Sequence, residues 1–196
     1  MIVAVINIKG GVGKTTTAMA LATAASRSGL EATVLDTDEQ SSASLWEYNV
    51  EQNGGSLPFE VRSANMADLL RLRKRGGDGF TVIDTPPTGK VTDTAKDVAD
   101  FVIVPTSPTG IDLQQTAGTV EKLEEAGKPY AVLIVRAEPR TLALKSAEAF
   151  LTGHDVSVFD AEIPKRADLG NVYGQPFGDD LYGYEAVYRE LSEALR

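Results

Sequence analysis

The stretch from residue 1 to residue 17 constrains the fold of this chain more than any other. An apolar run over residues 2–6 is typical of a buried strand, and the residues from Thr15 onward favour a helix. Between them lie three glycines in four positions, Gly10, Gly11 and Gly13. Glycines let the backbone turn tightly enough for several N–H groups to point at one anion. This strand–turn–helix order predicts a phosphate-binding loop at the N-terminus of a helix.

Two side chains of this loop suit phosphate chemistry. Lys14 adds a positive charge that can reach terminal phosphates, and Thr15 offers a hydroxyl to Mg²⁺. The strict pattern G-x-x-x-x-G-K-[ST] is not met, because Ile8 stands at its first glycine and a second lysine, Lys9, precedes the glycines. A flexible glycine turn without a ligand is the alternative interpretation. The strand before, the helix after and the GKTT sequence within favour phosphate binding.

Composition limits the classes of function. A chain of 196 residues is long enough for one α/β core, and we expect a single domain over residues 1–196. The absence of cysteine excludes disulfides, thiolate metal sites and iron–sulfur clusters. A net charge of −9 argues against a uniformly basic nucleic-acid binder, so such binding must be local. No leader precedes the first strand and no apolar stretch approaches ~20 residues, so we expect a cytoplasmic protein.

Strand-like and helix-like segments alternate along the chain. Further strands are expected at residues 31–36, 58–62 (an edge strand), 80–84, 101–105, 130–135 and 156–159. Helices are expected at residues 15–28, 43–48, 65–75, 93–99, 112–126, 142–151 and 183–195, with Gly76-Gly77-Asp78-Gly79 ending the third. This alternation predicts an α/β fold, a mostly parallel twisted sheet with helices on both faces. Ligands then bind at the carboxyl ends of the strands.

Aspartates follow two of these strands at the edge that carries the loop. Asp36 and Asp38 stand at the end of the strand at 31–36, and Asp84 stands at the end of the strand at 80–84. Phosphoryl transfer needs Mg²⁺ near the phosphates and a positioned water, and both call for carboxylates. Aspartate at a strand end is also a common turn former. Three aspartates beside the GKTT sequence favour a catalytic site.

Several segments resemble the ParA/MinD family of P-loop ATPases with a deviant Walker A motif, and most of all its small ParA-type partition ATPases. The segments are KGGVGKTT at 9–16, LDTDEQ at 35–40, VIDTPP at 82–87 and ADFVIVP at 99–105. The stretch TSPTGIDL at 106–113 is similar to the family's loop into its next helix. The similarity covers residues 1 to about 123 and weakens beyond.

The resemblance implies an ATP/ADP site with Mg²⁺. Lys9 corresponds to the signature lysine, which reaches the partner's phosphates across a dimer that encloses the nucleotides. Lys14 is the phosphate lysine within the chain, and Asp38 positions the attacking water, so the expected catalytic residues are Lys9, Lys14 and Asp38. Mg²⁺ is expected on Thr15 and, through water, on Asp36 and Asp84. The expected nucleotide contacts are Lys9, Gly10, Gly11, Val12, Gly13, Lys14, Thr15, Thr16 and Arg136.

Some positions depart from the family's pattern. Glu39 stands where the family commonly has proline, which predicts a more mobile loop. Val135 and Arg136 stand where the family often has Asn-Arg; Arg136 can still stack on a base, but the choice of purine stays open. Larger relatives carry an N-terminal helix-turn-helix region, and we expect none here, because the chain begins at its first strand.

The resemblance implies a DNA-segregation ATPase of plasmids or chromosomes. It would form a homodimer with ATP, bind DNA non-specifically on the nucleoid, and be released when a centromere-binding adaptor protein stimulates hydrolysis. The alternative is a MinD-like membrane-associated or protein-cargo positioning ATPase. We expect no membrane binding, because residues 185–196 hold three glutamates against two arginines. Candidate DNA contacts are Arg71, Arg73, Lys74, Arg75, Lys145, Lys165, Arg166 and Arg189.

Overall fold

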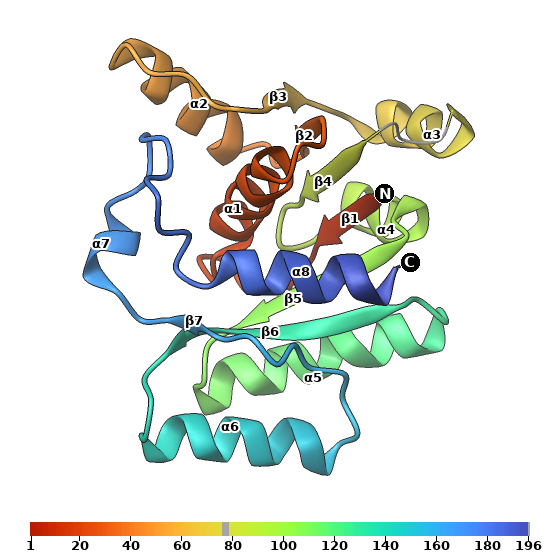
Figure 1. Cartoon of the computed structure of the whole chain (residues 1–196). Coiled ribbons are helices and arrows are strands. Elements are labelled where there is room, and N and C mark those ends of the chain that lie inside the picture. The colour runs from red at the N-terminus through yellow and green to blue at the C-terminus, as the bar shows by residue number, and fades with distance from the viewer. Residues whose placement is uncertain (76–78, 196) are drawn as a thin grey trace.

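The computed structural model describes residues 1–75 and 79–195 and places a seven-stranded sheet between two layers of helices (Figure 1). The strands are β1 (Ile2–Val5), β2 (Ala32–Asp36), β3 (Glu60–Ser63), β4 (Phe80–Asp84), β5 (Phe101–Thr106), β6 (Tyr130–Ala137) and β7 (Ile163–Pro164). Their order in the sheet is β3-β2-β4-β1-β5-β6-β7, and every neighbouring pair is parallel. The predicted α/β fold is confirmed, including the edge position of β3.

The helices cover both faces of the sheet, as parallel strands require. One face packs against α1 (Lys14–Arg27), α2 (Ser42–Gln52) and α8 (Tyr184–Ala194). The other packs against α3 (Met66–Arg75), α4 (Lys90–Val98), α5 (Gly110–Glu125) and α6 (Leu142–Gly153). The short α7 (Ala167–Gly170) was not expected. Every residue of β1, β4 and β5 is buried, which explains why these strands read as continuous apolar runs.

Two helices have a terminus that differs by three or more residues from the prediction. Helix α2 continues to Gln52 because Ala43, Trp46 and Val50 are buried at helical spacing and extend its inner face. Helix α4 begins at Lys90, directly after Gly89. The φ of Gly89 is 131°, a backbone conformation that residues with a Cβ rarely adopt. Of the predicted stop after α3, Gly76-Gly77-Asp78-Gly79, residues 76–78 lie outside the described residues, and Gly79 has a φ of 73°.

The prediction of a strand at 156–159 is wrong. Only Val158 forms a bridge there, to Val132 of β6. Beyond it, the backbone N–H groups of Asp160 (2.8 Å) and Ala161 (2.9 Å) donate to the Glu190 carboxylate instead of to β6. The sheet ends instead with β7, which pairs with β6.

Helix α8 is the closing helix of the core, as the sequence predicts. Its apolar residues Tyr184, Val187 and Leu191 are buried, and the helix lies against α1. Its apolar face is therefore occupied within the chain. Across residues 1–75 and 79–195, none of the helices has the length and apolar character that a membrane crossing demands.

Candidate functional site

The loop between β1 and α1 has the geometry of an anion cradle. Gly11 and Gly13 have φ values of 71° and 97°, which side chains with a Cβ rarely adopt. Gly13 is also the N-cap residue of α1, and within the described residues no side chain caps this end of the helix. The N–H groups of the first turn and the positive end of the helix dipole therefore stay available to a phosphate.

Lys14 lies inside the loop rather than in solvent. Its side chain is buried, and its Nζ donates to the backbone carbonyl of Lys9 at 3.0 Å. Burial lowers the pKa of Lys14, while the nearby charges of Asp84 and Asp38 raise it. The ammonium thus stands beside two of the predicted catalytic and metal-binding carboxylates, at the point where phosphates would enter.

Asp36 and Asp84 lie side by side at the ends of neighbouring strands. They are register partners in the β2–β4 ladder, and both are buried. Burial raises the pKa of Asp84 to about 7, opposed by the neighbouring Thr15 hydroxyl. The Thr15 hydroxyl lies close enough to lower this pKa, yet neither carboxylate oxygen of Asp84 meets the distance and angle of a hydrogen bond to any described residue. Since a buried carboxylate without a partner is costly, these atoms suit a cation or its bound water.

The chain itself orients the other two aspartates. Asp36 Oδ2 accepts hydrogen bonds from the Ser44 backbone N–H (2.8 Å) and hydroxyl (2.7 Å), which ties it to the start of α2. Asp38 is half-buried, and its Oδ1 accepts from the Gln40 backbone N–H at 2.9 Å. Asp36 and Asp38 open onto a cavity of about 710 Å³. It is lined by residues 36–41, 63–66 and 86–91.

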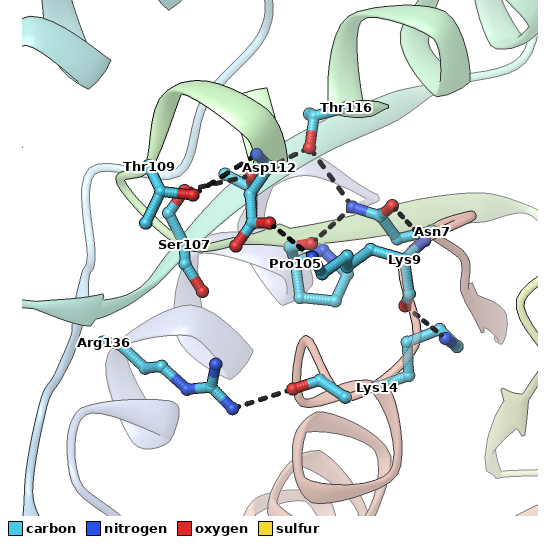
Figure 2. A network of polar contacts seen from close by, with 11 residues as sticks. Asn7, Lys9, Lys14, Pro105, Ser107, Thr109, Asp112, Thr116 and Arg136 are labelled. Atoms are coloured by element: carbon cyan, nitrogen blue, oxygen red, sulfur yellow. Dashed lines mark hydrogen bonds and ion pairs between the residues drawn. The ribbon is translucent and has the colours of Figure 1, made fainter. Parts of the chain in front are cut away.

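Lys9 points away from its own loop, toward helix α5. Its Nζ forms an ion pair of 3.2 Å with Asp112 Oδ1 (Figure 2). The Asp112 side chain is 10% exposed and the Lys9 side chain 37% exposed, so the pair is partly screened by solvent. The structure therefore pairs the Lys9 ammonium with Asp112 of α5, whereas the Lys14 ammonium lies near Asp38 and Asp84.

Arg136, at the end of β6, contacts the phosphate loop at Gly11. It has a φ of 57°, and its Nη2 donates to the backbone carbonyl of Gly11 at 2.7 Å (Figure 2). Beside it lies a cavity of about 220 Å³ that takes Val12, Gly13 and Thr16 from the loop side. The rest of its lining comes from Val135, Arg136, Ile163, Pro164, Lys165, Arg166, Leu169, Gly170 and Tyr184. This cavity adjoins the phosphate loop, so it is the expected place for the base of a nucleotide whose phosphates are on the loop.

Three contacts of the site lie outside the sequence prediction. Ser44 holds Asp36, Asp112 pairs with Lys9, and Asn7 donates to the backbone carbonyl of Pro105 at 2.8 Å while accepting from the Lys9 backbone N–H at 2.9 Å. In the sequence, Asn7 can be singled out because it is a polar residue directly after an apolar strand. Ser44 and Asp112 gave no signal, because each contact joins segments that are brought together only by the fold.

Residues 3–175 match the sequence profile of the CobQ/CobB/MinD/ParA nucleotide binding domain. The chain is 36% identical to maintenance of carboxysome distribution protein A of Gloeobacter kilaueensis, over 99% of this chain and 93% of that protein. It is 30% identical to the chromosome-partitioning ATPase Soj of Thermus thermophilus, over 98% and 94%. The fold matches a putative plasmid partition protein of Borrelia burgdorferi bound to AMPPNP, with a TM-score of 0.79, 20% identity and 98% of each chain covered. The chain therefore belongs to the CobQ/CobB/MinD/ParA nucleotide-binding family, as a ParA/MinD-type ATPase domain.

Proposed function

We propose that this chain is an ATP-dependent, dimerising positioning ATPase. The observation that carries the proposal is the buried pair Asp36 and Asp84 beside Lys14 and the open end of α1. A phosphate loop alone would bind nucleotide. A loop facing two buried carboxylates, one of them without a hydrogen-bond partner in the described chain, also provides for a metal ion and for hydrolysis.

The residues divide the work of phosphoryl transfer. The N–H groups of Gly10–Thr16 and the Lys14 ammonium bind and orient the phosphates, while Thr15, Asp36 and Asp84 would hold Mg²⁺. When bound, that ion neutralises charge on the phosphates. Asp38, at the cavity beside the aspartates, orients the attacking water. Arg136 and the hollow next to it receive the base.

Dimerisation depends on Lys9 in this proposal. In the single chain its ammonium is held by Asp112, so it contributes nothing to its own phosphates. When two chains meet over ATP, each Lys9 leaves Asp112 and pairs with phosphate on the partner. That charge arrives only in the dimer, which makes hydrolysis depend on association.

The proposed cargo is a large protein assembly. The support is the carboxysome distribution protein at 36% identity over nearly the whole chain. Segregation of DNA is the second candidate, supported by the chromosome-partitioning relative at 30% identity. In both cases the ATP-bound dimer holds DNA non-specifically on the nucleoid, and a partner protein triggers hydrolysis. Of the candidate DNA contacts, Lys165 and Arg166 pair with Glu138 and Asp168, which reduces the charge that they offer.

Two substitutions test the nucleotide chemistry. Lys14→Ala should lose ATP binding and slow Mg²⁺-dependent hydrolysis together, because it removes the only charge within the loop that faces the aspartates. Asp38→Ala should bind ATP and dimerise yet fail to turn over. Unaltered ATP affinity in Lys14→Ala would contradict the assignment of the phosphate site. Normal turnover in Asp38→Ala would mean that another residue orients the attacking water.

Deleting the gene in its native host tests the cargo. Clustering or uneven inheritance of a protein assembly, with DNA inherited normally, is the expected result. Loss of plasmid or chromosome at division, with protein assemblies spread normally, would favour the second candidate.

A further inference from the structure

The side chain of Asn7 is fully buried where β1 leads into the phosphate loop (Figure 2). Its Nδ2 donates to the backbone carbonyl of Pro105 (2.8 Å) and to the Thr116 hydroxyl (3.2 Å), and its Oδ1 accepts from the Lys9 backbone N–H (2.9 Å). A buried amide is tolerated only when its donors and acceptor are paired. Asn7 therefore joins β5, α5 and the loop through one side chain.

Asn7 takes over a hydrogen bond that the sheet would otherwise make. In the parallel ladder between β1 and β5, the Ile6 backbone N–H donates to the Ile103 carbonyl at 2.9 Å. Two residues on, the same pattern would join the Ile8 N–H to the Pro105 carbonyl. The Asn7 side chain occupies that carbonyl instead. The main chain is thereby released from the sheet after Ile6 and turns into the loop.

The other end of the amide fixes Lys9. The bond from the Lys9 N–H to Asn7 Oδ1 spans two residues and is a turn that asparagine favours. The Lys9 carbonyl is bound by Lys14 Nζ. With both its N–H and its carbonyl held, the Lys9 backbone has one orientation, and this orientation sets the direction in which the side chain leaves the loop.

All three partners of the amide require the same orientation: the Pro105 carbonyl can only accept from its nitrogen, and the Lys9 N–H can only donate to its oxygen. The Thr116 hydroxyl gives its proton to Thr106 Oγ1 at 2.8 Å, so it can only accept from Asn7. The nitrogen of the amide must then face α5 and the oxygen must face Lys9. We propose that Asn7, held by Pro105 and Thr116, is a positioning residue that aims Lys9 at the partner's nucleotide; this rests on the proposed role of Lys9 in dimerisation.

The inference predicts a split between two readouts. The backbone of residues 14–16 is held in the first turn of α1, and the link from these residues to Lys9 is the hydrogen bond of Lys14 Nζ to the Lys9 carbonyl, which does not involve the Lys9 side chain. Removing the Asn7–Thr116 link should leave ATP affinity within about twofold. ATP-dependent dimerisation and turnover should fall roughly fivefold to tenfold, the effect of one net hydrogen bond.

Thr116→Val is the main test, because valine keeps the volume of threonine and removes the hydroxyl. Thr116→Ser, which restores the hydroxyl, should recover dimerisation, and Asn7→Ala should lose at least as much as Thr116→Val. ATP affinity, ATP-dependent mass by light scattering and melting temperature are measured for each. If Asn7→Ala does not fold, the threonine pair decides. Equal losses of ATP affinity and dimerisation in Thr116→Val, or no loss in either, would overturn the inference.

A double variant separates this inference from the proposed function. Protein and ATP concentrations are raised until Lys9→Ala dimerises in part; if Asn7 and Thr116 act by aiming Lys9, Thr116→Val should then cause no further loss of dimerisation in that background. Additive losses would mean that Thr116 acts elsewhere and would overturn the inference. Normal dimerisation of Lys9→Ala itself would instead overturn the proposed role of Lys9.

Discussion

The site depends on single residues placed in costly positions, and Asp84 is the clearest of them. Its carboxyl is almost completely buried and has no hydrogen-bond partner in the described chain. A residue chosen only for folding would not be an acid here, because burial disfavours its charged form. A bound cation would offset the free-energy cost of burying this carboxylate, which is why we propose Asp84 as a metal-binding residue.

The titration of Asp84 gives a pH dependence of stability without nucleotide or metal. The folded chain holds the proton up to about pH 7, whereas the ordinary carboxyl releases it at 3.8. This contribution favours the folded state at low pH and is lost as the pH rises from about 4 to about 7. In EDTA, the melting temperature of the wild type should therefore fall more between pH 5 and pH 8 than that of Asp84→Asn. Parallel curves for the two proteins would contradict the shift.

Asp112 gives a second prediction at the residue scale. Because its carboxylate holds Lys9 within the chain, Asp112→Asn should lower the ATP concentration needed for dimerisation by roughly threefold to fivefold, as suits a partly exposed ion pair. Light scattering across an ATP titration measures this. Asp68→Asn, which removes an exposed ion pair with Arg71 on α3, is the matched control and should change nothing. A higher ATP requirement in Asp112→Asn would mean that this pair assists dimerisation instead.

At the scale of elements, helix α2 links the site to the core. Ser44 of α2 binds Asp36, and two residues later Trp46 is buried, with its indole Nε1 donating to the backbone carbonyl of Gln175 at 2.8 Å. Its ring packs on Tyr173 and Phe177. Trp46 thus anchors the helix whose first turn positions a predicted metal ligand.

The anchor can be measured by unfolding. Trp46→Ala should lower the free energy of unfolding by roughly 3–5 kcal/mol, the usual cost of removing a large buried ring. Tyr48→Ala on the same helix removes a side chain of a residue that is 55% exposed and should change it by less than about 0.5 kcal/mol. Chemical denaturation measures both. Similar losses in the two variants would show that α2 is not anchored through Trp46.

Sequence patterns predict helices and strands well where buried residues recur at regular spacing. They predict them poorly where a contact between distant segments determines the local structure. The runs at β1, β4 and β5 are buried on both sides, so apolarity alone marks them as strands. The segment 156–159 also has a strand-like pattern, yet just after it two backbone N–H groups donate to Glu190 and not to a neighbouring strand. Strand β7 is a strand that the sequence does not predict, since it is two residues long and includes a proline. The same holds for the site, because the motif residues follow each other along the chain, whereas Asp112 meets Lys9 only once α5 is packed.

At the scale of the whole molecule, charge and symmetry decide how the protein can work. With a net charge of −9, a single chain is repelled by DNA. In the proposed ATP-bound dimer any basic patch would be present twice, so that a weak patch would become effective only in the dimer. Such binding should be salt-sensitive and independent of sequence. Lys9 is the residue expected to connect ATP to this change.

Light scattering of wild type and Lys9→Ala, each with and without ATP and Mg²⁺, tests that connection most directly. The wild type should be a monomer without nucleotide and a dimer with ATP. Lys9→Ala should bind ATP, since Lys14 and the loop remain, yet stay monomeric under the same conditions. An ATP-dependent dimer of Lys9→Ala, or a wild type whose mass does not respond to ATP, would contradict the proposal.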